Sequence, residues 1–362
     1  MIALGIESSC DETAVALVGS DRRILAHSVL SQTTDHQPYG GVVPEIAARS
    51  HLTHLAPLIE STLKQANLSL DQVGLVAATA GPGLIGGLIV GLTMAKAIAL
   101  GKNKPFIAVN HLEAHALTVR LTDNVSFPYL LLLVSGGHCQ LILVTAVGKY
   151  TCLATTLDDA LGEAFDKVAK MLGLGFPGGP AVEKAAMKSH IRLHKNQPVR
   201  HFNLPRPMVG RVELNFSFSG LKTAVYQQAS ALAPAGSHLP ESLIEDLASA
   251  FQQAAIDCVI DRVKRALLLL GYRNIRPTAL VAAGGVAANQ ALRQALSGLA
   301  YHHDVHFIVP PVRLCTDNAA MIAWAGLELY QTGRCDDMLV VPRPRWPLDP
   351  SFSLNYADAT DI

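Results

Sequence analysis

The sequence predicts an α/β fold built as two related lobes. Its 362 residues, half of them hydrophobic, exceed what one hydrophobic core usually serves, so we expect about two domains. Two segments, at 2–18 and 128–144, share one pattern, in which two apolar runs flank a short loop of small and polar residues. This pattern is typical of a hairpin, and its recurrence suggests a duplicated fold. A single doubly wound domain remains the alternative.

Strand-like and helix-like segments alternate after each hairpin, which indicates the α/β class. Residues from about Ile85 to Leu100 predict a packed helix. The uncharged segment from Gln72 to Ala95 is long enough to span a membrane, but Gly81-Pro82-Gly83 interrupts it, so a strand, a turn and a helix are predicted instead. Strands are predicted at four short apolar runs: 73–80, 105–110, 278–285 and 306–310.

The composition excludes several classes of protein. Charged residues make up only 16% and the mean hydropathy is +0.29, the opposite of the signature of disorder. Six cysteines lie far apart without a Cys-x-x-Cys pair, which argues against a disulfide framework or a zinc finger and suits a reducing compartment. The start, MIALGIESSC, shows neither a signal nor a transit peptide, so we expect a cytoplasmic protein without a membrane segment.

The charge is balanced overall but unevenly distributed. Lys+Arg and Asp+Glu both number 29. Residues 184–212 hold seven of the positive charges and no acidic residue, so the remainder carries 22 against 29, a net of −7. This stretch is either a solvated loop or a phosphate-contacting patch. Its cations are Lys184, Lys188, Arg192, Lys195, Arg200, Arg206 and Arg211.

The glycine-rich segment 81–86, GPGLIG, follows a predicted strand and precedes a predicted helix, as in dinucleotide-binding folds. Such folds also place an acidic residue at the end of the next strand, to hold a ribose hydroxyl. Here that strand ends in Asn110, and Pro82 removes one amide from the turn. We therefore interpret the segment as a close-packing turn.

Two histidines, His111 and His115, are spaced to share one face of a helix that follows a buried strand. With Asp317 as a third ligand they form a candidate metal site, although an aspartate at a helix start is as often only an N-cap. The same spacing recurs at His190/His194 and His302/His306, so some copies are incidental. A zinc-protease site is disfavoured, because its glutamate would directly follow the first histidine and Glu113 is displaced by one residue.

Two loops carry the other candidate chemistry. The loop at 134–140, VSGGHCQ, is either an ordinary glycine hairpin or one whose amides approach an oxyanion or phosphate. The loop at 7–13 concentrates Glu7, Asp11 and Glu12, which can hold a metal or act as acid and base. Facing each other, the two loops would frame a nucleotide cleft.

Three further features lie in the second half of the chain. Asp159, Glu163 and Asp166 fall on one face of a predicted helix, usually a solvated face. The glycine- and proline-rich turn that follows is able to bring Asp166 and Gly179 to a ligand. In the strand, Gly-Gly and helix pattern at 281–293, the Asn289 amide is suited to bonding a base or ribose.

As an ordered set, ten blocks along the chain up to residue 348 closely resemble the bacterial TsaD family, the tRNA N6-adenosine threonylcarbamoyltransferases. They are IESSCDET, YGGVVPEIAARSH, GPGLIGGL, NHLEAHA, LLVSGGHCQL, GEAFDKVAKMLGLGFPGGP, FSFSGLKTA, AAGGVAANQALR, CTDNAAMIA and PRPRWPL. The resemblance implies the actin-like fold of sugar kinases and heat-shock chaperones, with lobes at 1–125 and 126–345 and a tail at 346–362. The helix after Asp317 is expected to pack back on the first lobe. The family's older label of O-sialoglycoprotein endopeptidase finds no support in these motifs.

The resemblance implies transfer of a threonylcarbamoyl group from threonylcarbamoyl-AMP to N6 of the adenosine 3' of the anticodon, in tRNAs reading ANN codons. It places one iron ion on His111, His115 and Asp317, with zinc or another divalent metal as the alternative, and it assigns catalytic importance to Asp11 and Glu12. The implied partners are tRNA, an inactive TsaB-like paralogue and a small TsaE-like ATPase. A metabolite kinase of the same fold and a non-catalytic nucleotide-binding scaffold are the competing hypotheses. The implied substrate-binding residues are Val134, Ser135, Gly136, Gly137, His138, Asp166, Gly179 and Asn289.

Overall fold

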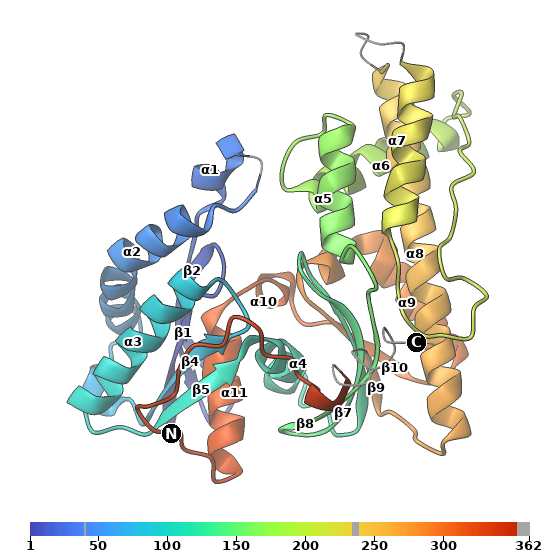
Figure 1. Cartoon of the computed structure of the whole chain (residues 1–362). Coiled ribbons are helices and arrows are strands. Elements are labelled where there is room, and N and C mark those ends of the chain that lie inside the picture. The colour runs from blue at the N-terminus through green and yellow to red at the C-terminus, as the bar shows by residue number, and fades with distance from the viewer. Residues whose placement is uncertain (40, 234–238, 353–362) are drawn as a thin grey trace, which may run out of the picture. The chain divides into compact units, whose positions relative to one another are not determined.

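The computed structural model describes residues 1–39, 41–233 and 239–352, and the chain divides into two compact units. Unit 1 comprises Met1–Ser126, Val144–Thr151 and the chain from Pro310 onward, and unit 2 comprises Phe127–Leu143 and Cys152–Val309. Residues 310–345, which sequence reasoning placed in the second lobe, thus fall in unit 1. The physical reason is helix α11 (Ala319–Gln331), which packs on β1 (Ile2–Glu7), β2 (Glu12–Gly19) and β4 (Leu75–Gly81) of the first sheet (Figure 1).

The sheet of unit 1 has the strand order β3-β2-β1-β4-β5. β1 pairs antiparallel with β2 and parallel with β4, and β4 pairs parallel with β5. β1 and β4 are almost continuous runs of buried residues, as expected for strands covered on both faces. The strands are β1 (Ile2–Glu7), β2 (Glu12–Gly19), β3 (Ile24–Ser31), β4 (Leu75–Gly81) and β5 (Phe106–Asn110).

Helices cover both faces of this sheet, which follows from the alternation of side chains along β1. Leu4 and Ile6 share a core with Leu55 of α2 and Leu92 of α3. Gly5, which points the opposite way, lies against the backbone of α11. The helices of unit 1 are α1 (Thr33–His36), α2 (Pro44–Gln65), α3 (Ile85–Gly101), α4 (His111–Thr122), α10 (Val312–Cys315) and α11, with short 3-10 helices at Gln37–Tyr39 (η1) and Leu70–Gln72 (η2).

The second sheet has the strand order β10-β9-β6-β7-β8, in which β6, β9 and β10 run parallel. Its core is shared with the long helix α8, which buries a continuous stripe of residues against the unit. The strands are β6 (Tyr129–Val134), β7 (Cys139–Ala146), β8 (Lys149–Thr155), β9 (Ala279–Ala283) and β10 (His306–Ile308). The helices are α5 (Leu161–Met171), α6 (Gly178–His194), α7 (Ser219–Leu232), α8 (Glu241–Tyr272) and α9 (Gln290–His302), with η3 at Gly285–Ala288.

The predicted elements are present. β1 and β2 form an antiparallel hairpin, and β6 and β7 are neighbouring strands joined by the four-residue loop 135–138. The segment that sequence reasoning divided into strand, turn and helix is β4, the Gly81-Pro82-Gly83 turn and α3. No helix in the described ranges is both long and apolar enough to cross a membrane.

Candidate active site and metal centre

Helix α4 begins immediately after β5, and Asn110 fixes its first residue. The Asn110 side-chain oxygen accepts hydrogen bonds from the backbone amides of Leu112 (2.9 Å) and Glu113 (3.4 Å), an N-cap arrangement. The helix therefore starts at His111, and the spacing of four residues puts His115 on the same face. Both imidazoles are buried.

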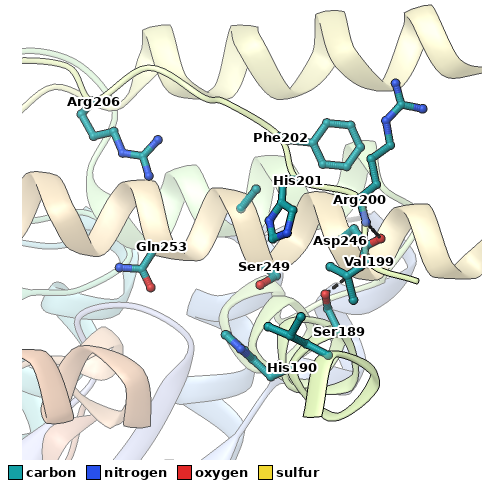
Figure 2. A pocket seen from close by; sticks show the side chains of 12 residues that line it. Ser189, His190, Val199, Arg200, His201, Phe202, Arg206, Asp246, Ser249 and Gln253 are labelled. Carbon is teal, nitrogen blue, oxygen red and sulfur yellow. Dashed lines mark hydrogen bonds between the residues drawn. The ribbon is translucent and has the colours of Figure 1, made fainter. Parts of the chain in front are cut away.

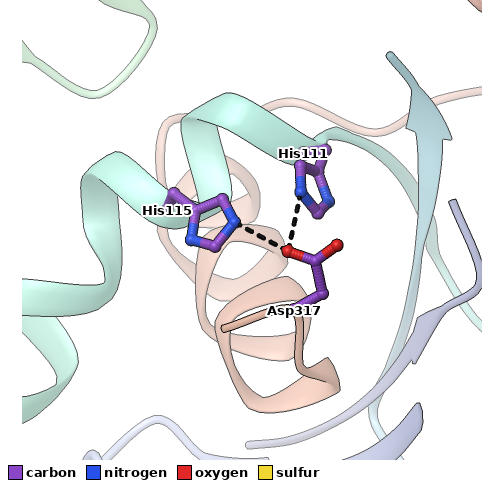
Figure 3. A group of neighbouring side chains, drawn as sticks. All are labelled: His111, His115 and Asp317. Carbon is purple, nitrogen blue, oxygen red and sulfur yellow. Dashed lines mark hydrogen bonds and ion pairs between the residues drawn. The ribbon is translucent and has the colours of Figure 1, made fainter. Parts of the chain in front are cut away.

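Asp317 lies just before the start of α11, and its carboxylate contacts both histidines. Its Oδ1 lies 3.2 Å from Nε2 of His111 and 3.1 Å from Nε2 of His115 (Figure 3). The N-cap of α11 is the next residue, Asn318, whose side chain accepts from the amide of Met321. The alternative that Asp317 serves only as an N-cap is therefore wrong, and its carboxylate is directed at the two histidines.

The donor set fits a divalent metal ion. The three ligand atoms of His111, His115 and Asp317 lie within 4.8 Å of one another. Two imidazole nitrogens and one carboxylate oxygen are ligands for zinc or ferrous iron, and three protein ligands leave positions open for substrate or water. Within the described residues, the equally spaced pairs His190/His194 and His302/His306 join no such group.

Strong electrostatic coupling holds this group together. Burial opposes charge on each member, yet Asp317 and Glu7 together keep the pKa of His111 well above its ordinary value. Conversely, His111 holds the pKa of Asp317 well below its usual range and lowers that of Glu7, again against the effect of burial. Burial dominates at His115, whose pKa is lowered. His111 thus lies between two carboxylates, with Glu7 2.9 Å from its Nδ1 and Asp317 3.2 Å from its Nε2.

The acidic loop lies beside the metal group. Burial, reinforced by the negative charges of Asp317 and Asp11, raises the pKa of Glu12 to about 9. The loop is held from α2, because His51 Nε2 lies 3.0 Å from the carbonyl oxygen of Cys10. The sequence expectation that Asp11 and Glu12 are functional is therefore compatible with a position next to Asp317.

Glycines of the 81–91 segment let this loop approach α3. A Cβ on Gly87 would overlap the carbonyl oxygen of Ser8, and one on Gly83 would lie 2.6 Å from that of Ser9. The Ser8 hydroxyl donates to the Gly87 carbonyl at 2.9 Å. The close-packing interpretation of the glycine-rich segment is confirmed, and the glycines serve protein packing.

Glu113 is buried but faces away from the metal group. Its Oε1 accepts from the Tyr150 hydroxyl (2.8 Å) and from the Gly148 amide (3.2 Å). The glutamate thus anchors the turn between β7 and β8 to α4, which explains why 144–151 belongs to unit 1. A protease-type base at this position is excluded by its orientation.

In unit 2, the glycine loop follows β6 and is internally braced. The Ser135 amide donates to the His138 carbonyl at 2.8 Å, and the His138 amide donates to Ser135 Oγ at 3.1 Å. Gly136 and Gly137 at its tip are exposed, and a Cβ there would meet nothing within 4 Å. At the adjacent strand end, Gly284 approaches the carbonyl of Val134 so closely that no side chain fits. The loop thus presents accessible backbone.

The other expected substrate residues also make structural contacts. Asp166 Oδ1 accepts from the Gly178 amide (2.7 Å) at the start of α6, next to Gly179, so the structure brings these two expected residues together. Asn289 is buried, caps α9 through its side-chain oxygen and donates to Gln252 Oε1 at 2.8 Å. Its amide is therefore committed to the fold in this state.

The predicted acidic helix face is wrong for Asp159, because α5 begins at Leu161 and holds only Glu163 and Asp166; the acidic group is neutralised within unit 2. Lys167 bridges Asp159 (2.7 Å) and Glu163 (2.6 Å), and Lys222 adds a second contact to Asp159 at 2.7 Å. Asp166, the third acid of that face, turns instead to α6. This face is consequently a structural ion-pair network.

The solvated-loop interpretation of residues 184–212 is wrong for its first part, which lies in α6. Three of its cations are bound to acidic residues of α8: Lys188 to Glu241, Arg192 to Glu245 and Asp246, and Arg206 to Asp257. In the described part of the chain, the remaining four cations are exposed and form no ion pair. These are Lys184, Lys195, Arg200 and Arg211.

One of the unpaired cations borders a cavity of about 230 Å³ between α6, α8 and the segment that follows α6 (Figure 2). The Arg200 guanidinium stacks over Phe202, 5.4 Å from the ring centroid. His201 and Ser249 also line the cavity, and neither makes a side-chain hydrogen bond to another described residue. The Arg200–Phe202 stack, next to the side chains of His201 and Ser249, is suited to contact a phosphate and a base of a nucleic acid.

Comparison with known proteins gives one consistent family. The chain matches the family described as TsaD, tRNA N6-adenosine threonylcarbamoyltransferase, over residues 23–324. A protein of that name from Paramagnetospirillum magneticum is 56% identical over 351 residues, covering 97% of this chain and 98% of the relative. Another, from Rhodospirillum rubrum, is 57% identical over 352 residues, covering 96% and 94%.

Solved structures show the fold. HypF from T. kodakarensis superposes with a TM-score of 0.59 at 12% identity, covering 92% of this chain and 48% of that one. Component A of the (R)-2-hydroxyglutaryl-CoA dehydratase from Acidaminococcus fermentans gives 0.51 at 15% identity, covering 92% and 98%. The predicted two-lobed actin-like α/β fold is confirmed.

Proposed function

The chain belongs to the TsaD family of tRNA N6-adenosine threonylcarbamoyltransferases, and from this premise we propose how its residues divide the work of the reaction. The observation that carries the function is identity of 56–57% over nearly the full length of both chains. It favours the transferase over the kinase and scaffold alternatives. The proposed donor is threonylcarbamoyl-AMP, and the acceptor is N6 of the adenosine 3' of the anticodon in tRNAs that read ANN codons.

The reaction needs an electrophilic carbonyl and a positioned amine. The N6 lone pair forms a bond to the carbamoyl carbon, the bond from that carbon to the AMP phosphate oxygen breaks, and N6 loses a proton. We assign acceptance of this proton to the Asp11 carboxylate, and a hydrogen-bond-donating role to Glu12, whose raised pKa of about 9 keeps it protonated at neutral pH. AMP leaves as a stable anion, so the protein's main tasks are orientation and charge stabilisation.

His111, His115 and Asp317 are proposed to hold one divalent metal ion, most simply ferrous iron because two histidines and one carboxylate are its common ligand set, with zinc as the alternative. When bound, such an ion supplies Lewis acidity to a carbonyl or phosphoryl oxygen. The burial of both histidines supports this assignment, since it keeps competing water away from the ligand atoms.

The residues of unit 2 are proposed to hold the adenylate. Accessible amides at Gly136 and Gly137, between Ser135 and His138, suit a phosphate. Val134, Asp166, Gly179 and Asn289 are expected to complete the nucleotide and threonyl sites, with the Asn289 amide exchanging its contact to Gln252 for one to the ligand. These proposals follow the family pattern and the positions of strand ends and helix starts.

For tRNA we propose that the unpaired cations of the 184–212 stretch contact phosphates, with Arg200 at the cavity of Figure 2 as the central contact. Arg200→Glu is expected to weaken tRNA binding, and Arg200→Ala to lower the slope of log affinity against log salt by about 0.7–0.9. Lys188→Ala, which removes a cation already bound to Glu241, is the control. Unchanged affinity and slope in the Arg200 variants would remove this contact.

The full reaction tests the proposal. The purified chain, with its proposed TsaB-like and TsaE-like partners and ATP in a parallel tube, is incubated with threonylcarbamoyl-AMP and unmodified tRNA, and threonylcarbamoyladenosine is quantified by nucleoside mass spectrometry. We expect product in the wild type, none in His111→Ala or Asp317→Ala, and a wild-type level in His194→Ala, a histidine of an incidental pair. If a folded, metal-loaded chain with both partners forms no product, the proposed activity is overturned. We propose that the reaction takes place in the cytoplasm.

A further inference from the structure

Glu7 is a fully buried carboxylate that no expectation from the sequence singled out beyond its place among three acids. It ends β1, and three chain segments converge on it. Its Oε1 accepts from the Ser9 amide at 2.6 Å, while Oε2 accepts from the Thr79 hydroxyl of β4 at 2.5 Å. The same Oε2 lies 2.9 Å from Nδ1 of His111.

The geometry places Glu7 behind the imidazole rather than among the ligands. The nitrogen of His111 that faces Asp317 is Nε2, and the nitrogen that faces Glu7 is Nδ1. The two nitrogens of one ring point in divergent directions, so Glu7 and Asp317 are on opposite sides of it. Glu7 is accordingly outside the group of converging ligand atoms.

We propose that Glu7 is the positioning residue of the metal centre, accepting the Nδ1 proton of His111 so that Nε2 is free and aimed at the ion. This inference rests on the proposed metal site. A carboxylate behind a ligating histidine fixes its tautomer and ring orientation and increases its basicity as a ligand. The donors from Ser9 and Thr79 fix the carboxylate in turn, so the orientation of His111 is set by the sheet itself.

The two histidines are supported unequally. Nδ1 of His115 is buried, and the described residues offer it no hydrogen-bond partner. In the described structure His115 is oriented by Asp317, by its edge-to-face contact with the His111 ring and by the packing of α4. Loss of Glu7 therefore affects one ligand and leaves the other in place, so it should weaken metal binding without abolishing it.

Glu7→Gln is the informative variant, because a glutamine has one accepting oxygen where the carboxylate has two. If its oxygen accepts from Ser9, its NH2 faces Nδ1 of His111 and forces the proton onto Nε2, the metal-binding nitrogen. Glu113→Gln is the matched control, because Glu113 is another buried carboxylate, in α4 itself, whose two hydrogen bonds both go to Oε1 and survive in glutamine.

The test measures metal binding directly. The full chain is titrated with Zn²⁺ and Co²⁺ in competition with a chromophoric chelator, and the visible spectrum of the Co²⁺ form is recorded. Glu7→Gln is expected to lower affinity by about 10- to 100-fold and to shift the Co²⁺ bands, whereas Glu113→Gln stays within about threefold of wild type. If Glu7→Gln does not fold, Thr79→Val, which removes one of the donors to Glu7, should lower affinity by at least about threefold.

The outcomes separate this inference from the proposal it rests on. A folded wild-type chain that binds neither ion overturns the metal site itself. Binding by the wild type together with wild-type affinity and an unchanged spectrum in Glu7→Gln overturns the role of Glu7. An equal loss in Glu113→Gln also overturns it, because the effect would then be general to buried charge near α4.

Discussion

Substitution of Gly5 by alanine tests whether the packing of β1 against α11 fixes the positions of the proposed metal ligands. Gly5 lies in the middle of β1, and a Cβ there would overlap the carbonyl of Ala319 and lie 2.6 Å from the amide nitrogen of Ala323. An ordinary contact needs roughly 3.5 Å, so sheet and helix must separate by at least about 0.9 Å at Ala323, and by more at the closer Ala319 carbonyl. Because α11 is buried along nearly its whole length, it has little freedom to retreat.

The expected consequence is twofold. Overpacking of this kind costs about 1–3 kcal/mol of unfolding free energy. Asp317 lies two residues before α11, so a shift of about 0.9 Å exceeds the tolerance of about 0.2 Å for metal-ligand distances. Zinc affinity is therefore expected to fall even where the variant remains folded.

The assay combines urea unfolding with chelator competition for Zn²⁺. The control is Gly298→Ala in α9, where a Cβ meets nothing within 4 Å and alanine should stabilise the helix by about 0.5–1 kcal/mol. If Gly5→Ala unfolds within about 0.5 kcal/mol of wild type and binds zinc equally well, the close approach of β1 and α11 does not determine the ligand geometry.

Two further predictions concern unit 2. Asp246 is buried and accepts hydrogen bonds from Ser189, Arg192 and the Arg200 amide, so Asp246→Ala should lower the free energy of unfolding in urea by about 3–5 kcal/mol. Lys188→Ala, which removes an exposed ion pair, should lower it by less than about 1 kcal/mol. Equal losses in the two variants would contradict this ranking. Burial opposes ionisation of Asp158, but hydrogen bonds from Ser217, the Phe218 amide and Ser219 lower its pKa below the unfolded value of about 3.8. Its ionised form therefore stabilises the fold above that value, and the stability difference between wild type and Asp158→Ala should shrink as the pH falls through the lower, folded pKa. A difference that stays constant from pH 7 to pH 2 in urea unfolding would refute this.

Local patterns in the sequence were sufficient for the α/β class and for the shared helix face of the two histidines, whereas the actin-like fold came from the family resemblance. Apolar runs predicted the strands and α3, and the spacing of His111 and His115 predicted one helix face. The approach of Asp317 to these histidines, some 200 positions away in sequence, depends on the tertiary fold and cannot be predicted from local spacing. It depends on Asn318, rather than Asp317, taking the capping role, and both residue types serve as N-caps.

The charge pattern was the least informative signal, because whether a charged side chain is free or ion-paired depends on residues that are distant in sequence. The 184–212 stretch contains no acid, yet α8 supplies four carboxylates to three of its cations. The acidic face at Asp159 and Glu163 is likewise neutralised, in part by Lys222 of another helix. The one sequence signal for Glu7 was its position: an acid at the end of an otherwise apolar, buried strand requires a partner.

The chain beyond α11 helps to support the metal centre. Asn110 caps α4 with its side-chain oxygen while its amide donates to the Trp346 carbonyl at 3.0 Å. The same segment is fastened to α3 by Lys96, which donates to the Met338 carbonyl at 2.9 Å. In the same segment, the Arg343 amide donates to the Ala80 carbonyl oxygen at 2.7 Å. Asn110, the N-cap of the histidine helix, is thus held from both sides, so changes in the 338–346 segment should affect His111 through Asn110.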